Sequence, residues 1–305
     1  MSDPVRQTGS RASPGGSGAS SGGSAAGFEP AVARWRAMVE AEHAQTDRLR
    51  GEAPPEDYWS PFAGQFRPDL AGPEDPTLRL IAPMVSPDWE ILDVGAGGGR
   101  LALLLARLCR RVTAVEPSAA MAAELREAAR INDIGNVSVV ETTWEEADVQ
   151  PADLVVCAHV LYTSREVGAF LRKMEERARA RVVVALFTDT PQWQLFPFWE
   201  RVYGEERLRL PGLTDLMGVL WEMGVYPDLT MLPPRTSQGY PDRERARELI
   251  RARLFIAPGS EQDRRLGQAM DELLVPQPDG GVKVKGVSER RAGLVTWRPA
   301  DTTRA

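Results

Sequence analysis

The sequence has little of the chemistry on which metal and disulfide sites depend. Its 305 residues include two histidines, His43 and His159, and two cysteines, Cys109 and Cys157. Zinc sites draw most of their ligands from these two residue types, and a disulfide framework needs a larger even set of cysteines. We therefore expect neither a metal site nor structural disulfides.

Positive charge is not in excess either. The chain has 37 Lys and Arg against 43 Asp and Glu, a formal net charge of −6, whereas proteins that grip phosphates usually carry a basic surface. Five arginines fall within residues 243–253, but carboxylates such as Glu244 and Glu248 alternate with them. We interpret this stretch as a charged helix face, with a local basic patch as the alternative, and expect no nucleic-acid partner.

Long apolar runs are also missing. No stretch approaches the roughly 20 apolar residues that cross a bilayer, so no membrane segment is expected. Residues 1–27 are rich in Gly and Ser, lack Leu, Ile and aromatic side chains, and have no apolar centre typical of a signal peptide. Such a segment cannot offset its ordering entropy, so we predict a disordered tail. Because neither a signal peptide nor a disulfide framework is visible, we expect a cytoplasmic protein.

Past the tail, apolar residues follow two alternating periods. A helical pattern at 28–50 precedes a proline-rich connection, and from residue 90 short apolar runs alternate with helical ones. Strands whose two faces are both apolar are typical of a parallel sheet covered by helices on each side. The fold class is therefore predicted to be α/β, a Rossmann-like doubly wound sheet. Its predicted strands are 90–94, 112–116, 137–140, 153–157, 182–186, 228–232 and 293–297.

The predicted helices lie between and after these strands. Ser118 is placed to cap a helix at 119–131, and Thr163 to Glu166 form a capping-box pattern ahead of a helix at 165–177. Helical additions are expected after the fifth and sixth strands, before a turn at 278–281. We predict one domain over 28–305, with an N-terminal cap at 28–75, a core at 76–190 and a C-terminal part at 191–305.

A glycine-rich turn joins the first strand to the next helix. Gly95, Gly97, Gly98 and Gly99 let the backbone approach a ligand closely and leave free amides at a helix N-terminus. The dinucleotide fingerprint needs a further glycine three residues after its second one, and that position here is Arg100. The turn therefore indicates a nucleotide-like ligand and opposes NAD.

Two carboxylates flank this turn in the sequence. Glu116 ends the second predicted strand, where a carboxylate can accept hydrogen bonds from both hydroxyls of a ribose. Asp93 precedes Gly95 by two residues, and a carboxylate there suits a ligand that carries positive charge and no phosphate.

Three segments together resemble the class I S-adenosylmethionine-dependent methyltransferases: residues 90–99 (EILDVGAGGG), 115–118 (VEPS) and 153–159 (DLVVCAH). The resemblance covers about residues 75–190. It implies a seven-stranded sheet with an antiparallel final strand and S-adenosyl-L-methionine as the cofactor. By this resemblance the cofactor would be held by Asp93, Gly95, Ala96, Gly97, Glu116, Pro117, Met121, Thr143, Trp144 and Ala158, although Met121 and Trp144 could instead be core residues.

The sequence says less about the residues that bind the methyl acceptor. His159 follows the fourth strand, where this family's acceptor pocket opens, and an imidazole can take a proton near neutral pH; it is either a base or a residue that shapes the pocket. Residues 158–161 (AHVL) differ from the Asn/Asp-Pro-Pro-Tyr run of many amide and adenine methyltransferases. We predict a small-molecule acceptor methylated on oxygen or nitrogen, in a pocket lined by Tyr58, Trp59, His159, Tyr162, Trp193 and Phe196.

Two other functions stay open at this stage. Because no indispensable catalytic residue is visible, the chain could be a non-catalytic protein of the same fold that binds the cofactor or scaffolds a partner. An NAD-dependent oxidoreductase is the third possibility, which Arg100 and the glycine spacing oppose.

Overall fold

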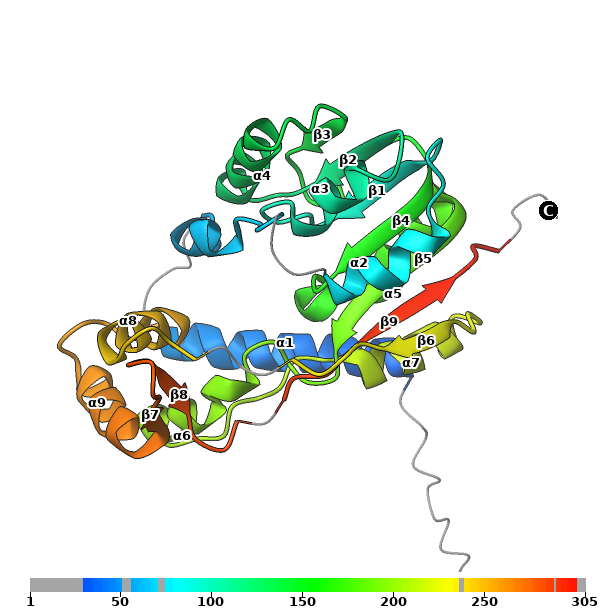
Figure 1. The fold of residues 1–305 in the computed structure, drawn as a ribbon. Coiled ribbons are helices and arrows are strands. Elements are labelled where there is room, and N and C mark those ends of the chain that lie inside the picture. The colour runs from blue at the N-terminus through cyan, green and yellow to red at the C-terminus, as the bar shows by residue number, and fades with distance from the viewer. Residues whose placement is uncertain (1–29, 51–55, 71–74, 236–238, 288, 301–305) are drawn as a thin grey trace, which may run out of the picture.

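The computed structural model describes residues 30–50, 56–70, 75–235, 239–287 and 289–300 (Figure 1). The predicted tail at 1–27 lies outside these ranges. None of the helices within them is long and apolar enough to span a membrane.

Within the described ranges, seven strands form one sheet in the order β3-β2-β1-β4-β5-β9-β6. The first five strands are parallel, whereas β9 runs antiparallel to both β5 and β6. The predicted doubly wound sheet with an antiparallel final strand is confirmed. Chain order reverses between β1 and β4, which puts the ligand-binding edge at their carboxyl ends. The strands are β1 (Glu90–Val94), β2 (Arg111–Val115), β3 (Val137–Val140), β4 (Ala152–Ala158), β5 (Ala178–Phe187), β6 (Asp228–Met231) and β9 (Ala292–Trp297).

Helices cover both faces of the sheet because successive strand residues point to opposite sides and both are apolar. Ile91 packs on one face with α2 (Pro76–Ile81), α3 (Arg100–Ala106) and α4 (Ala119–Ile131). Leu92 packs on the other, which is covered by α1 (Ala31–Arg50), α5 (Val167–Arg177) and α7 (Leu213–Glu222). Both faces of the sheet are therefore buried under apolar side chains, as the continuous apolar strands predicted.

Local capping agrees with the sequence at one helix and differs at another. The Ser118 hydroxyl accepts a hydrogen bond from the Met121 amide at 3.1 Å, so the predicted cap of α4 is confirmed. The predicted capping box before α5 is wrong: Thr163 ends a short 3₁₀ turn, η3 (Leu161–Thr163), and α5 begins at Val167 without a side-chain cap. Glu166 pairs with Arg36 of α1 instead.

The helical additions enclose an apolar core of their own. It is built from η4 (Trp193–Leu195), α6 (Phe196–Tyr203), α8 (Arg243–Arg253) and α9 (Glu261–Leu273), with Phe198 and Trp199 fully buried at its centre. An unpredicted hairpin, β7 (Leu274–Pro276) and β8 (Val282–Val284), flanks the predicted turn at 278–281. Figure 1 shows these additions on the side toward which β4 and β5 run, with α1 extending alongside both parts.

Candidate active site

The glycine turn lies at the carboxyl end of β1, beside the point where strand order reverses. The amides of Gly95 and Ala96 donate to the Val115 carbonyl at 2.8 and 3.2 Å, which ties the turn to β2. Gly95 and Gly97 have φ of 70° and 56°, a left-handed conformation that favours glycine. A Cβ at Gly97 would meet nothing within 4 Å. Gly97 therefore presents open backbone to a ligand.

Glu116 lies against this turn with half of its hydrogen-bonding capacity unused. Its Oε2 accepts from the Gly97 amide at 2.7 Å and its Oε1 from the Ser118 amide at 2.9 Å. A carboxylate has about four lone-pair sites, so two remain, which matches the two hydroxyls of a ribose. Burial raises the pKa of Glu116, whereas the two amides act in the opposite direction.

Asp93 has a buried carboxylate oxygen without a hydrogen-bond partner among the described residues. It is 2% exposed, and its Oδ2 has no hydrogen-bond partner among the described residues. Burial raises the pKa of Asp93 to about 7, although the nearby Arg100 guanidinium acts against this. A buried polar atom without a partner is costly, and a ligand ammonium group would satisfy it. The two carboxylates thus fit a ligand with a diol and an ammonium group.

The raised pKa of Asp93 makes a prediction about the pH dependence of stability. An unfolded aspartate titrates at about 3.9, so the folded chain holds this proton over a wider range. Its contribution to the free energy of unfolding is fully present below about pH 4 and falls as pH rises toward 7, by up to about 1.4 kcal/mol per pH unit. Asp93→Asn should remove this fall, as urea unfolding of both proteins between pH 4 and 8 would measure. Identical pH profiles would show that Asp93 is not the group responsible.

The other predicted cofactor residues are distributed around this turn. Pro117 is exposed after Glu116, Ala158 ends β4, and Met121 is 3% exposed in the first turn of α4. The indole of Trp144 belongs to the core, because its N–H donates to the Phe170 carbonyl at 3.2 Å. Thr143 precedes it, and its hydroxyl accepts from the Glu146 amide at 3.4 Å.

His159 is held in an unusual conformation just after β4. Its φ is 62°, rare for a residue other than glycine, and its amide donates to the Ala185 carbonyl of β5 at 2.8 Å. The imidazole stacks on the Phe187 ring at 4.1 Å between centroids. The side chain is therefore fixed at the carboxyl edge of β4 and β5.

A hydrogen-bond chain sets the tautomer of His159. The Phe187 amide donates to the Tyr162 hydroxyl at 2.8 Å, and that oxygen lies 3.1 Å from His159 Nδ1. Because Nδ1 is the remaining acceptor for the phenol hydrogen among the described contacts, we assign the proton of the imidazole to Nε2. Burial, followed by the charges of Arg100 and Arg290, lowers the pKa of His159 to about 3. The imidazole is thus neutral at pH 7.

The predicted acceptor-pocket residues occupy two places. Tyr162 contacts His159, and Trp193 and Phe196 begin the additions that follow β5. Tyr58 and Trp59 contact each other, and Arg253 of α8 approaches both. No hydrogen bond or ring contact in the described part of the chain joins these two groups.

The segment that carries Tyr58 and Trp59 covers the glycine turn. It includes the turn η1 (Ser60–Phe66), which packs on α4, and the Phe66 carbonyl occupies the space that a Cβ of Gly98 would need. Asp57 accepts from the Ser118 hydroxyl at 2.8 Å and from the Ala120 amide at 3.3 Å. Sequence reasoning missed Asp57, since nothing in the local pattern marks it.

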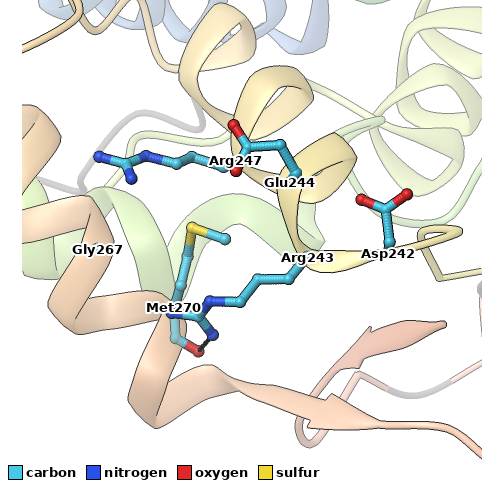
Figure 2. A pocket seen from close by; sticks show the side chains of 6 residues that line it. All are labelled: Asp242, Arg243, Glu244, Arg247, Gly267 and Met270. Carbon is cyan, nitrogen blue, oxygen red and sulfur yellow. Dashed lines mark hydrogen bonds between the residues drawn. The ribbon is translucent and has the colours of Figure 1, made fainter. Parts of the chain in front are cut away.

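A hollow of about 440 Å³ lies elsewhere, in the helical additions (Figure 2). Its two arginines already have partners: Arg243 pairs with Asp271 at 2.6 Å, and Arg247 pairs with Asp263 at 3.0 Å. It contains no glycine-turn residue, so we do not regard it as the active site. Its lining residues are Asp242, Arg243, Glu244, Arg247, Gly267 and Met270.

Comparison with known proteins agrees with this geometry. A family model described as a methyltransferase domain matches residues 91–180, which include the glycine turn, Glu116 and His159. The YcgJ protein from Bacillus subtilis is 14% identical, with a TM-score of 0.50; the match covers 73% of this chain and 97% of that one. A putative methyltransferase from Bacillus halodurans C-125 is 17% identical, with the same coverages and TM-score. No curated protein matches the sequence.

These matches define the fold of the protein. At such identities the two structures show the fold alone, and it is a Rossmann-like methyltransferase fold. Residues 91–180, in the core of the chain, match the model described as a methyltransferase domain. The resemblance stated from the sequence is confirmed.

Proposed function

We propose that this chain is an S-adenosylmethionine-dependent methyltransferase that moves the methyl group to an oxygen or nitrogen of a small-molecule acceptor. The observation that carries the proposal is the pair of carboxylates at the glycine turn. Glu116 has two free lone-pair sites and Asp93 has a partnerless buried oxygen. S-adenosylmethionine has a ribose diol and an ammonium group and no phosphate, so its polar groups match what these side chains lack.

The residues of this chain would bind and orient the cofactor. Glu116 would accept from the ribose hydroxyls, Asp93 would face the ammonium group, and the open backbone at Gly97 would lie beneath the ligand. When bound, the cofactor supplies a sulfonium-activated methyl group that is open to in-line attack. The protein then needs mainly to orient the nucleophile and to exclude water.

His159 is placed to orient the acceptor. With its pKa lowered to about 3, the imidazole is a weak base at pH 7. Its Nε2–H is a fixed donor because the Tyr162 hydroxyl holds Nδ1. We therefore assign His159 a positioning role through a hydrogen bond to the acceptor, and this role favours an acceptor that carries a lone pair.

Methyl transfer is tested by product formation. The protein, methyl-labelled S-adenosylmethionine and a fractionated small-molecule extract should yield S-adenosylhomocysteine and a labelled product of low mass. His159→Asn keeps the left-handed backbone accessible, and it should lower kcat about tenfold with the cofactor Kd changed by less than about twofold. Equal losses in kcat and cofactor affinity would make His159 merely structural. Cofactor binding without S-adenosylhomocysteine from any fraction would favour the non-catalytic alternative.

A further inference from the structure

A half-buried arginine, Arg290, lies near His159 with the Phe187 ring between them, and it has no carboxylate partner among the described residues. The guanidinium carbon of Arg290 is 3.7 Å from the centroid of Phe187, the same ring on which His159 stacks. One Nη donates to the Pro191 carbonyl at 2.9 Å, whereas Nε is buried with no hydrogen-bond partner among the described residues. No carboxylate of those residues forms an ion pair with it. Most N–H groups of the Arg290 guanidinium therefore have no hydrogen-bond acceptor among the described residues.

The backbone fixes Arg290 at the ligand-binding edge of the sheet. Arg235, beyond the carboxyl end of β6, and Arg290, just before β9, exchange two backbone hydrogen bonds of 2.8 Å. The neighbouring residue Arg291 accepts from the Thr188 amide at 2.9 Å, just past the end of β5. Arg290 is thus held at the edge where β4 and β5 end, which is also the edge of His159.

Two other arginines at this edge have an ion-pair partner, unlike Arg290 among the described residues. Arg100 and Arg235 share one carboxylate, that of Asp75. Asp189 acts electrostatically on Arg290, but it is exposed and its carboxylate accepts from the Thr188 hydroxyl at 3.0 Å. A poorly solvated guanidinium without a partner is costly, and a ligand anion would offset that cost.

We propose that Arg290 binds a carboxylate of the acceptor, so that the acceptor is a small carboxylic acid held next to His159; this rests on the proposed function. The planar guanidinium fork matches a carboxylate in a bidentate arrangement. Arg290 contributes one uncompensated charge, which suits a monoanion better than a phosphate monoester with a charge near −2. The cofactor also has a carboxylate, and the test below separates that source from the acceptor.

The test compares three probes of similar shape: benzoate, neutral benzamide and phenyl phosphate. Each is titrated by calorimetry into the full chain, with and without saturating S-adenosylhomocysteine. Benzoate should bind at least about tenfold more tightly than benzamide, and Arg290→Gln should abolish that difference. Arg290→Lys, which keeps the charge but loses the fork, should retain part of it. Arg291→Gln is the matched control, because Arg291 is adjacent and exposed, and it should change nothing.

Several results would overturn the proposal. Equal binding of benzoate and benzamide to the wild-type chain, or no benzoate binding at all, would remove the carboxylate site. Tighter binding of phenyl phosphate than of benzoate would assign the site to a phosphate. A parallel loss of S-adenosylhomocysteine affinity in Arg290→Gln would assign the guanidinium to the cofactor. If S-adenosylhomocysteine fails to bind while benzoate still depends on Arg290, the proposed function fails and the anion site stands.

Discussion

Replacing Glu116 by glutamine should weaken the binding of S-adenosylmethionine by at least about 100-fold. The carboxylate has two lone-pair sites left after the Gly97 and Ser118 amides, and each hydrogen bond to a charged group contributes about 1.5–3 kcal/mol. The amide of glutamine has the same shape but half the acceptor capacity, so it cannot hold two backbone amides and a diol together. Calorimetric titration of both proteins measures the difference in Kd.

A second carboxylate variant controls for the change of charge. Glu127 lies on α4, is partly exposed and pairs with Arg130 on the helix surface. Glu127→Gln should leave the cofactor Kd within about twofold of the wild type. An unchanged Kd in Glu116→Gln, with thermal unfolding like that of the wild type, would remove Glu116 from the cofactor site.

Replacing Trp35 by alanine should destabilise the fold by about 3–5 kcal/mol. Trp35 of α1 is 1% exposed, packs in the core beneath the sheet and donates from its indole to the Ser164 carbonyl at 2.9 Å. Its loss leaves a large cavity and an unsatisfied carbonyl. Denaturant unfolding measures the free energy directly.

Trp221 provides the matched control for that measurement. It has the same side chain on α7 but is 57% exposed. Trp221→Ala should change the free energy of unfolding by about 0.5 kcal/mol or less. Equal effects of the two substitutions would mean that α1 does not pack on the sheet as described.

The sheet and the cofactor side of the site could be predicted because their signals are local. Ile91 and Leu92 show within one strand that both faces are covered, and the glycine turn follows directly. Glu116 was found because a strand end marks it. Such features need only a few neighbouring residues to be recognised.

The remaining features depend on contacts between distant segments. The capping box before α5 was predicted wrongly because Glu166 finds a partner on α1, Arg36, 130 residues away. Strands β7 and β8 have three residues each, too few for a periodic signal. Arg290 packs on the ring of Phe187, which lies on a strand about a hundred residues earlier in the sequence. Sequence spacing does not reveal such pairings.

The central claim is that the glycine turn, Asp93 and Glu116 form a site for S-adenosylmethionine. Its most direct test is calorimetric titration of the wild-type chain with S-adenosylmethionine, repeated in the presence of NAD. We expect saturable binding with one site per chain, unaffected by NAD. The absence of binding, or its loss when NAD is present, would contradict it.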